Sequence, residues 1–135
     1  MVTSGNLDDV RAFLTTELST DITRAMEALR AYKTETNKMA GMTVTEENAI
    51  EMLRVYTLAL HSELNELLAE FNWKPWKKTQ KPVDVKHAAK EFGDILAFIG
   101  TLITALDAMG ISPQILSDGY VSAELENLRR FNGEY

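Results

Sequence analysis

Glu63-Leu64-Asn65-Glu66 and Glu91-Phe92-Gly93-Asp94 are the two stretches on which the fold of this chain depends. Each stretch places two carboxylates three residues apart, so on an α-helix both side chains lie on one face, with Cβ atoms about 5–6 Å apart. Like charges at that spacing destabilise a helix unless a positive group lies between them. On two neighbouring helices the four carboxylates form a ring of oxygen ligands, which suits Mg²⁺ and leaves positions for water and phosphate. The two stretches therefore predict a metal site for a phosphate-bearing substrate.

Apolar residues recur at helical spacing on both sides of these stretches, which predicts an all-α fold of four to five helices in a bundle. Residues 7–32 form one helix or two, because residues 19–21 either break the helix or cap a second piece. Residues 34–42 are polar and contain a glycine, which predicts a loop. There is no alternation typical of strands and no internal repeat. The 135 residues are expected to form a single domain, residues 1–135.

The helices that carry the acids have start and stop signals. Residues 43–46 (Thr-Val-Thr-Glu) fit a capping box, so a helix is expected to start there and to carry an apolar stripe as far as Phe71. Residues 72–82 read as the main loop, and Asp84 then opens a helix that Gly110 ends. These two helices are expected to place the four acids side by side.

A last helix and a wide apolar surface complete the expected architecture. Ser112 followed by Pro113 predicts a helix start, and this helix is expected to continue to Phe131 unless Gly119 interrupts it. The helix from Asp84 has an apolar arc wider than about 100°, which suggests burial against more than one neighbour. We therefore expect a homodimer or homotetramer, with the active site completed in the oligomer.

Composition excludes several classes of protein. The chain has 45% hydrophobic and 25% charged residues, which is ordinary for a globular domain. It has no cysteine, so disulfides and thiolate metal sites are excluded. The net charge of −6 argues against a nucleic-acid partner. The start lacks a signal-peptide pattern, and the longest uncharged apolar run, residues 95–106, is too short to span a membrane. We expect a cytoplasmic protein with no membrane partner.

The loop between the acid pairs concentrates positive charge and carries both tryptophans. It contains Trp73, Lys74, Trp76, Lys77, Lys78 and Lys81. Lysines beside an acidic ring favour contact with phosphate, and an aromatic ring beside a cation site can stack on a nucleobase. The plain alternatives are solvated lysines and tryptophans that pack between the helices. Arg129 and Arg130 likewise either reach phosphate or complement the C-terminal dipole of the last helix.

The two histidines are weaker candidates. His61 points almost opposite to Glu63 and Glu66, which lie along one edge of the apolar stripe, so it is a poor ligand candidate. His87 lies one turn before Glu91. It either supports that carboxylate or is a surface residue at a helix start, and the second interpretation is the commoner one.

These motifs together resemble the E-x-x-E…E-x-x-D signature of the all-α nucleoside triphosphate pyrophosphohydrolases, the MazG-like and dimeric dUTPase group. Residues 63–78, with Asn-Trp-Lys-Pro-Trp-Lys at 72–77, are similar to dUTPase-like members from phages and bacteria. Residues 127–135 are similar to the C-termini of these members. The likeness is specific over residues 60–98, looser at the tail and absent before Thr43.

The resemblance implies an activity and a set of site residues. Members cleave nucleoside triphosphates to monophosphate and pyrophosphate, so a pyrophosphohydrolase acting on dUTP or another dNTP is expected here, with Mg²⁺ as cofactor and Mn²⁺ as a substitute. The implied metal and catalytic residues are Glu63, Glu66, Glu91 and Asp94. The expected substrate-binding residues are Trp73, Lys74, Trp76, Lys77, Lys78, Asn127 and Arg130. Many relatives carry an asparagine about two turns after the last acid, where this chain has Gly100 and Thr101, so the resemblance does not assign the base and sugar contacts.

Two other classes remain open on the sequence. A ferritin-like di-iron bundle also uses helical carboxylates, but it needs Glu-x-x-His motifs that neither acid pair provides. A non-catalytic helical interaction module, with the acids as a solvated face, is the other alternative. A rise in melting temperature on addition of Mg²⁺ separates this module from a metal enzyme.

Overall fold

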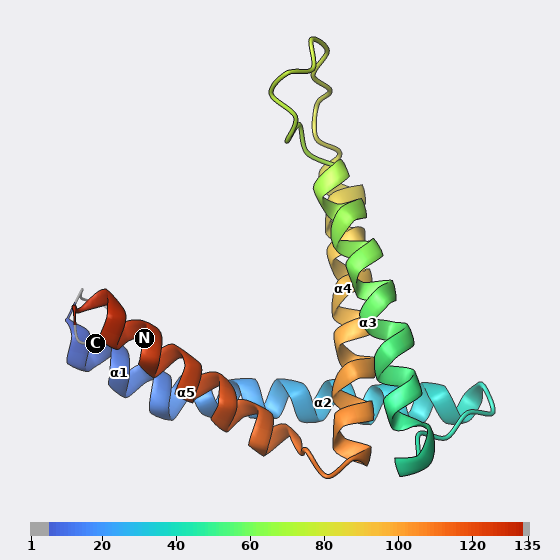
Figure 1. Ribbon diagram of the computed structural model, residues 1–135, viewed down its shortest axis with the longest axis vertical. Helices are drawn as coiled ribbons and strands as arrows, with labels where there is room; N and C mark the ends of the chain where they lie inside the picture. Colours follow the sequence, from blue (N-terminus) through green and yellow to red (C-terminus); the bar gives the residue numbers. More distant parts are fainter. Residues whose placement is uncertain (1–5, 134–135) are drawn as a thin grey trace.

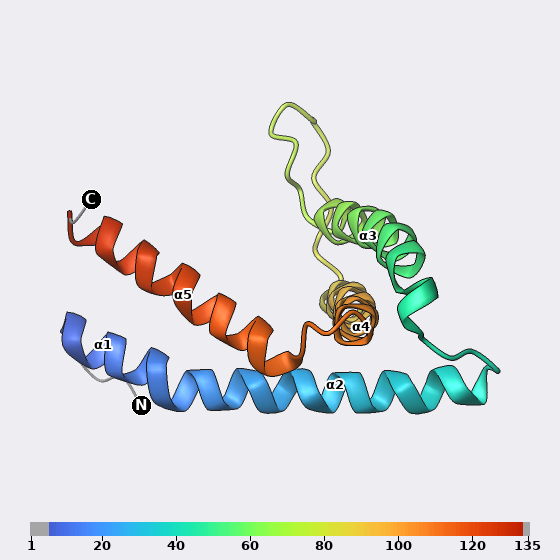
Figure 2. The ribbon, with the colours of Figure 1, turned by 60° about the horizontal axis from the view of Figure 1, so that its bottom comes forward.

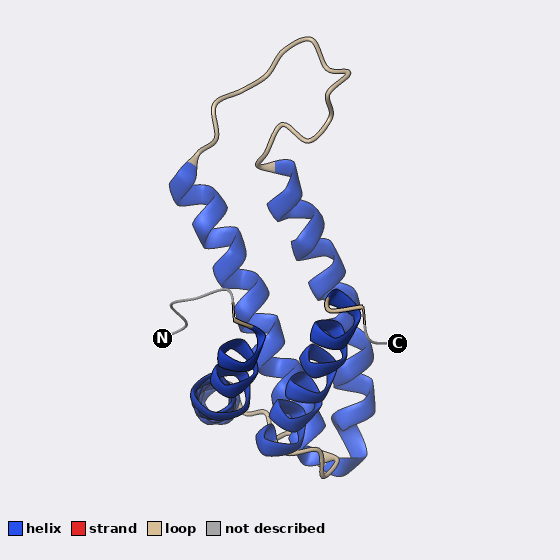
Figure 3. Ribbon diagram, turned by 90° about the vertical axis from the view of Figure 1, so that its left-hand side faces the viewer, coloured by secondary structure: helices blue, strands red, loops and turns tan. Residues whose placement is uncertain are grey.

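Every regular element in the computed structural model, which describes residues 6–133, is a helix. The elements are α1 (Leu7–Phe13), the π-helical segment η1 (Leu14–Leu18), α2 (Ser19–Met39), α3 (Glu46–Ala69), α4 (Val85–Ala108) and α5 (Pro113–Phe131). The predicted all-α class is confirmed. Figure 3 shows the helices joined by short connections, except for one long loop between α3 and α4.

The helices form two arms. α3 and α4 pack side by side as an antiparallel hairpin, while α1, η1 and α2 form one long rod along which α5 lies (Figure 1). The hairpin stands steeply on the rod, with α4 between α3 and α2 (Figure 2). α4 is therefore the central helix, which explains the width of its apolar arc. Its buried residues are Ala88, Ile95, Gly100, Thr101, Ile103, Thr104 and Ala105.

The helix starts follow capping chemistry, with one shift from the expectation. Asp84 caps α4 by accepting a hydrogen bond from the backbone N–H of His87 at 3.1 Å. Ser112 caps α5, with Pro113 at the first helical position, as predicted. The capping box of α3 is formed by Thr45 and Asn48, so the helix begins two residues later than the Thr43 start that the sequence suggested.

The loop predicted over residues 34–42 is wrong for residues 34–39, because α2 continues through Met39, and only residues 40–42 of that range lie outside a helix. Its polar residues do not break the helix, which crosses α4 just before them, where Arg30 pairs with Asp107 at 3.3 Å. The helix ends where Gly41, with φ 74°, lets the backbone N–H groups of residues 41 and 42 return to the last turn. Residues 19–21 do not break the rod, and Gly119 does not interrupt α5.

The buried core is small for a chain of this size. Ala49, Met52 and Ala105 form its centre, where α3 packs on α4. The accessible surface is 9447 Å², against about 7,100 Å² expected for a compact monomer of this mass. Large apolar side chains are left exposed on the hairpin, among them Leu64 at 48% and Phe92 at 51%. One copy of the chain therefore leaves much apolar surface in contact with water.

No single helix within residues 6–133 is long and apolar enough to cross a membrane, and α4 and α5 pass that test only as a pair bent by 111°.

Candidate metal centre and nucleotide site

The four predicted acids lie on the two helices of the hairpin. Glu63 and Glu66 are on α3, and Glu91 and Asp94 are on α4. Carboxylate oxygens of Glu63, Glu66 and Glu91 lie within 4.8 Å of one another, and the charge of Asp94 reaches Glu63. Three of the four predicted acids therefore meet between the helices, whereas Asp94 lies outside the group within 4.8 Å and acts on Glu63 only through its charge.

Burial and the closeness of these carboxylates raise the pKa of Glu63. Its side chain is half-buried against the hairpin, and burial is the largest cause that raises its pKa above the ordinary value of 4.5. The negative charges of Glu66, Asp94 and Glu91 raise the pKa further, and a hydrogen bond with Glu66 acts in the same direction. Without a cation, the cluster therefore favours a proton on Glu63 at a higher pH than an isolated glutamate would.

Two carboxylate oxygens in the cluster have no hydrogen-bond partner among the described residues. They are Oε2 of Glu63 and Oε2 of Glu91, and both are buried from solvent. A buried carboxylate oxygen without a donor is costly, and a hard cation satisfies it. These two oxygens, together with the exposed carboxylate of Glu66, form a donor set that fits Mg²⁺ or Mn²⁺.

A histidine borders the acid cluster. His87, at the start of α4, has Nε2 3.5 Å from Oε1 of Glu91 and directs Nδ1 to Oε1 of Glu70 on α3. The sequence placed His87 one turn before Glu91 but favoured a surface role. The bond to Glu70 could not be read from the sequence, because it depends on how the last turn of α3 meets the first turn of α4.

Hydrogen bonds and ring contacts within the loop between α3 and α4 define its conformation. At its base, Asn72 donates to the carbonyl oxygen of Lys81 at 2.6 Å and accepts from its backbone N–H at 3.2 Å. The rings of Trp73 and Trp76 meet edge to face with centroids 6.1 Å apart, and the ammonium group of Lys74 lies 5.1 Å from the centre of the Trp73 ring. These contacts within the loop therefore define its conformation.

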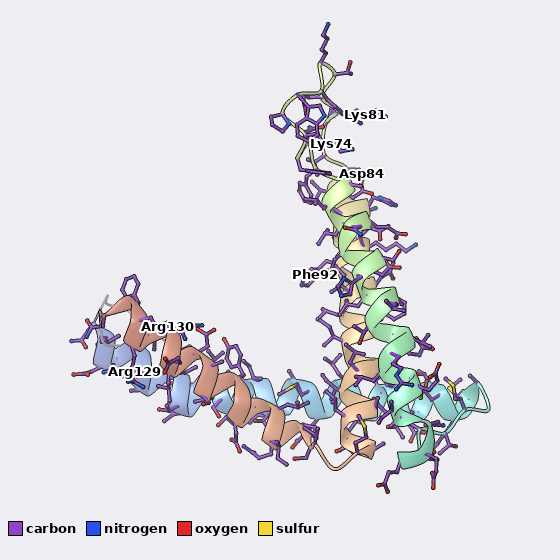
Figure 4. The ribbon with its side chains drawn as sticks, in the orientation of Figure 1. Lys74, Lys81, Asp84, Phe92, Arg129 and Arg130 are labelled. Carbon is purple, nitrogen blue, oxygen red and sulfur yellow. The ribbon has the colours of Figure 1, made fainter. Side chains whose placement is uncertain are left out.

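This loop encloses an open cavity of about 490 Å³ next to the end of the hairpin. Trp73, Lys74 and Lys77 line it, as does Glu70, which connects the cavity to the acid cluster. Trp76, which is 70% exposed, and Lys78 do not line it. Figure 4 shows Lys74 and Lys81 beyond the end of the hairpin.

The two C-terminal candidates lie on the other arm. Arg130 is near the free end of α5, far from the loop lysines (Figure 4), and its guanidinium pairs with Glu126 at 3.6 Å. Asn127 lies on the same helix and contacts Glu124 at 3.5 Å. One copy of the chain therefore does not bring Asn127 and Arg130 to the acid cluster.

Comparison with known protein families identifies the family to which this chain belongs. Residues 25–115 match the family model described as dUTPase. The chain belongs to this all-α dimeric dUTPase family. The match includes both acid pairs, the lysine and tryptophan loop and His87, but it ends before Asn127 and Arg130. No curated protein and no solved structure matches the chain.

The extent of the match also corrects one limit of the sequence resemblance, which found no likeness before Thr43. The dUTPase match starts at residue 25 and includes most of α2. The four-acid motif can be recognised by eye because its spacing is regular. The matched part of α2 has no comparable motif, and its role in the fold is to cross α4 at residues 30–33.

Proposed function

We propose that this chain is a Mg²⁺-dependent pyrophosphohydrolase that converts a dNTP to dNMP and pyrophosphate, with dUTP as the favoured substrate. The observation that carries the proposal is the pair of buried oxygens on Glu63 and Glu91 that no described donor satisfies. They lie in a three-carboxylate group inside the segment that matches the dUTPase family. A solvated acidic face does not bury carboxylate oxygens in this way.

In the proposed site, Glu63, Glu66, Glu91 and Asp94 hold the cation. When bound, Mg²⁺ supplies neutralisation of the phosphate charge and a lower pKa for bound water. Glu63 is the candidate to accept a proton from the attacking water, because burial and its acidic neighbours raise its pKa above the ordinary value.

The loop is the proposed substrate-contact element. Lys74 and Lys77 line the cavity at the end of the hairpin, so their ammonium groups can neutralise phosphate oxygens. Trp73 lines the same cavity and offers a ring face to a base. Trp76 and Lys78 enter the site only if the loop changes shape when nucleotide binds.

The proposed assembly is a homodimer or homotetramer. The excess of about 2,300 Å² of surface per chain matches what a large obligate interface buries. Phe92 and Leu64 belong to the surface that we expect a second copy to cover. Asn127 and Arg130 lie on the other arm, so we propose that they act on a nucleotide held by a neighbouring subunit.

The test is turnover by variants that differ in one carboxylate on the same helix. Glu66→Gln removes a ligand, whereas Glu51→Gln removes an exposed glutamate of α3 that pairs only with Arg54 among the described residues. We expect pyrophosphate release from dUTP with Mg²⁺ to fall by at least about 10²-fold in Glu66→Gln, because the site loses a first-sphere charge. Glu51→Gln should stay within about twofold of the wild type, as expected for a surface position.

The same assay run on all common dNTPs and NTPs identifies the base and the sugar. Full activity of Glu66→Gln would remove the metal assignment. If the wild type releases pyrophosphate from none of these substrates and Mg²⁺ does not raise its melting temperature, the enzyme proposal is wrong and the helical interaction module is favoured.

A further inference from the structure

One contact between the helices of the hairpin goes beyond the four-acid motif. The ring of His87 lies between a carboxylate of α3, that of Glu70, and a carboxylate of α4, that of Glu91, with one nitrogen directed to each. The backbone N–H of His87 is bound by Asp84, so the residue is fixed at the start of α4. A histidine held at both ring nitrogens and at its backbone N–H is well suited to set the position of its neighbours.

Glu91 divides its two oxygens between this ring and the acid cluster. Oε1 lies 3.5 Å from Nε2 of His87, while Oε2 is buried and has no partner among the described residues. The side chain of Glu91 is only 12% exposed, so it has little freedom to turn outward. The contact of Oε1 with His87 leaves Oε2 as the unpartnered oxygen of a carboxylate that lies within 4.8 Å of oxygens of Glu63 and Glu66.

Glu70 orients the ring from the other side. The His87 side chain is 52% exposed, and without a second contact it could rotate into solvent. The Glu70 side chain is 20% exposed and binds Nδ1. Glu70 also lines the loop cavity, so the same contact joins the end of α3, the loop and the acid cluster.

We propose that His87 and Glu70 are positioning residues that hold the Glu91 carboxylate in its metal-binding orientation. This inference rests on the proposed metal site and adds two residues to it that bind no substrate. Removing a hydrogen-bond partner of a metal ligand lowers metal affinity or activity by about 10–100-fold. We expect about tenfold here, the lower end of that range, because the histidine is half exposed.

The chemistry also distinguishes this role from a second metal site. Glu70, His87 and Glu91 have potential ligand atoms within 4.8 Å of one another. However, both ring nitrogens already face carboxylates, so an ion there would have to displace one of these contacts. A positioning role changes the affinity of the main site, whereas a ligand role changes the number of ions bound.

The experiment measures Mn²⁺ binding to the metal-free full-length protein by EPR, which counts free Mn²⁺ and needs no turnover. His87→Ala should bind the same number of ions as the wild type with a dissociation constant about tenfold higher. His61→Ala is the matched control, since His61 is exposed on α3 and has no ion pair among the described residues. It should bind Mn²⁺ as the wild type does.

A set of Glu70 variants tests whether Glu70 acts on Glu91 through the ring of His87. Glu70→Ala should weaken Mn²⁺ binding less than His87→Ala, and the double variant should equal His87→Ala, because both residues act through one ring. Glu70→Gln keeps an acceptor oxygen and should recover most of the affinity. In the turnover assay, raising Mg²⁺ should restore the maximal rate of His87→Ala to within about twofold, since only the position of one ligand has changed.

Three results would overturn the inference. Unchanged affinity in His87→Ala removes the positioning role, and loss of one bound ion with the remaining affinity intact assigns His87 as a ligand. Additive losses in the double variant show that the two residues do not act through one ring. A wild type that binds no Mn²⁺ overturns the proposed function itself, and this outcome is distinct because it does not depend on any variant.

Discussion

Truncation of Phe92 should separate the subunits of the proposed dimer. Phe92 projects from α4 on the open side of the hairpin (Figure 4) and is 51% exposed. A phenylalanine side chain offers roughly 200 Å², so about 100 Å² is left for a partner to cover. At about 25 cal/mol per Å², burial contributes about 2.5 kcal/mol per copy and about 5 kcal/mol per two-fold dimer. Phe92→Ala should therefore raise the dimer dissociation constant by about 10³-fold or more.

Light scattering during size-exclusion chromatography over a dilution series measures this change. The wild type should give at least twice the 15.2 kDa of one chain at micromolar concentration, and Phe92→Ala should dissociate. Met39→Ala is the control, because Met39 is a large apolar residue at the end of α2 that is 87% exposed. A wild-type mass of one chain, or equal dissociation in the two variants, would refute the assignment of this surface to a second copy.

Two further predictions concern the site. Because burial and acidic neighbours raise the pKa of Glu63, the folded metal-free chain holds this proton more tightly than the unfolded chain, whose value is 4.5. Its contribution to stability is therefore complete below pH 4.5 and is lost as the pH rises through the folded-state pKa. Melting curves without metal should show Glu63→Gln gaining on the wild type as pH increases above 4.5; a constant difference would contradict the raised pKa. For the loop, a non-hydrolysable dNTP with Mg²⁺ should change the fluorescence of Trp73 and protect the loop from trypsin. Lys74→Ala should then weaken triphosphate binding more than nucleoside binding; fluorescence and affinity that ignore the ligand would assign the loop a purely structural role.

The helix starts and the acid pairs could be predicted from the sequence because they depend on residues only a few positions apart. Asp84 caps α4 and Ser112 caps α5, each by accepting a hydrogen bond from the backbone N–H three residues ahead. The all-α class and the pairing of Glu63 with Glu66 follow from helical periodicity in the same way. Local rules misplaced residues 34–39, where polar composition suggested a loop. In the structure α2 crosses α4 just before that segment and stays helical as far as Met39.

The sequence alone determined the helices, the four acids and the loop that joins the acid pairs, since each is specified by spacing along the chain. Only the tertiary structure decided how these parts meet. The antiparallel register of α3 and α4 brings Glu70 to His87 and leaves Oε2 of Glu91 buried beside Glu63. The steep angle between the arms separates Arg130 from the acid cluster within one chain (Figure 1). Both outcomes depend on contacts between residues far apart in sequence, where packing rather than local propensity determines which side chains meet.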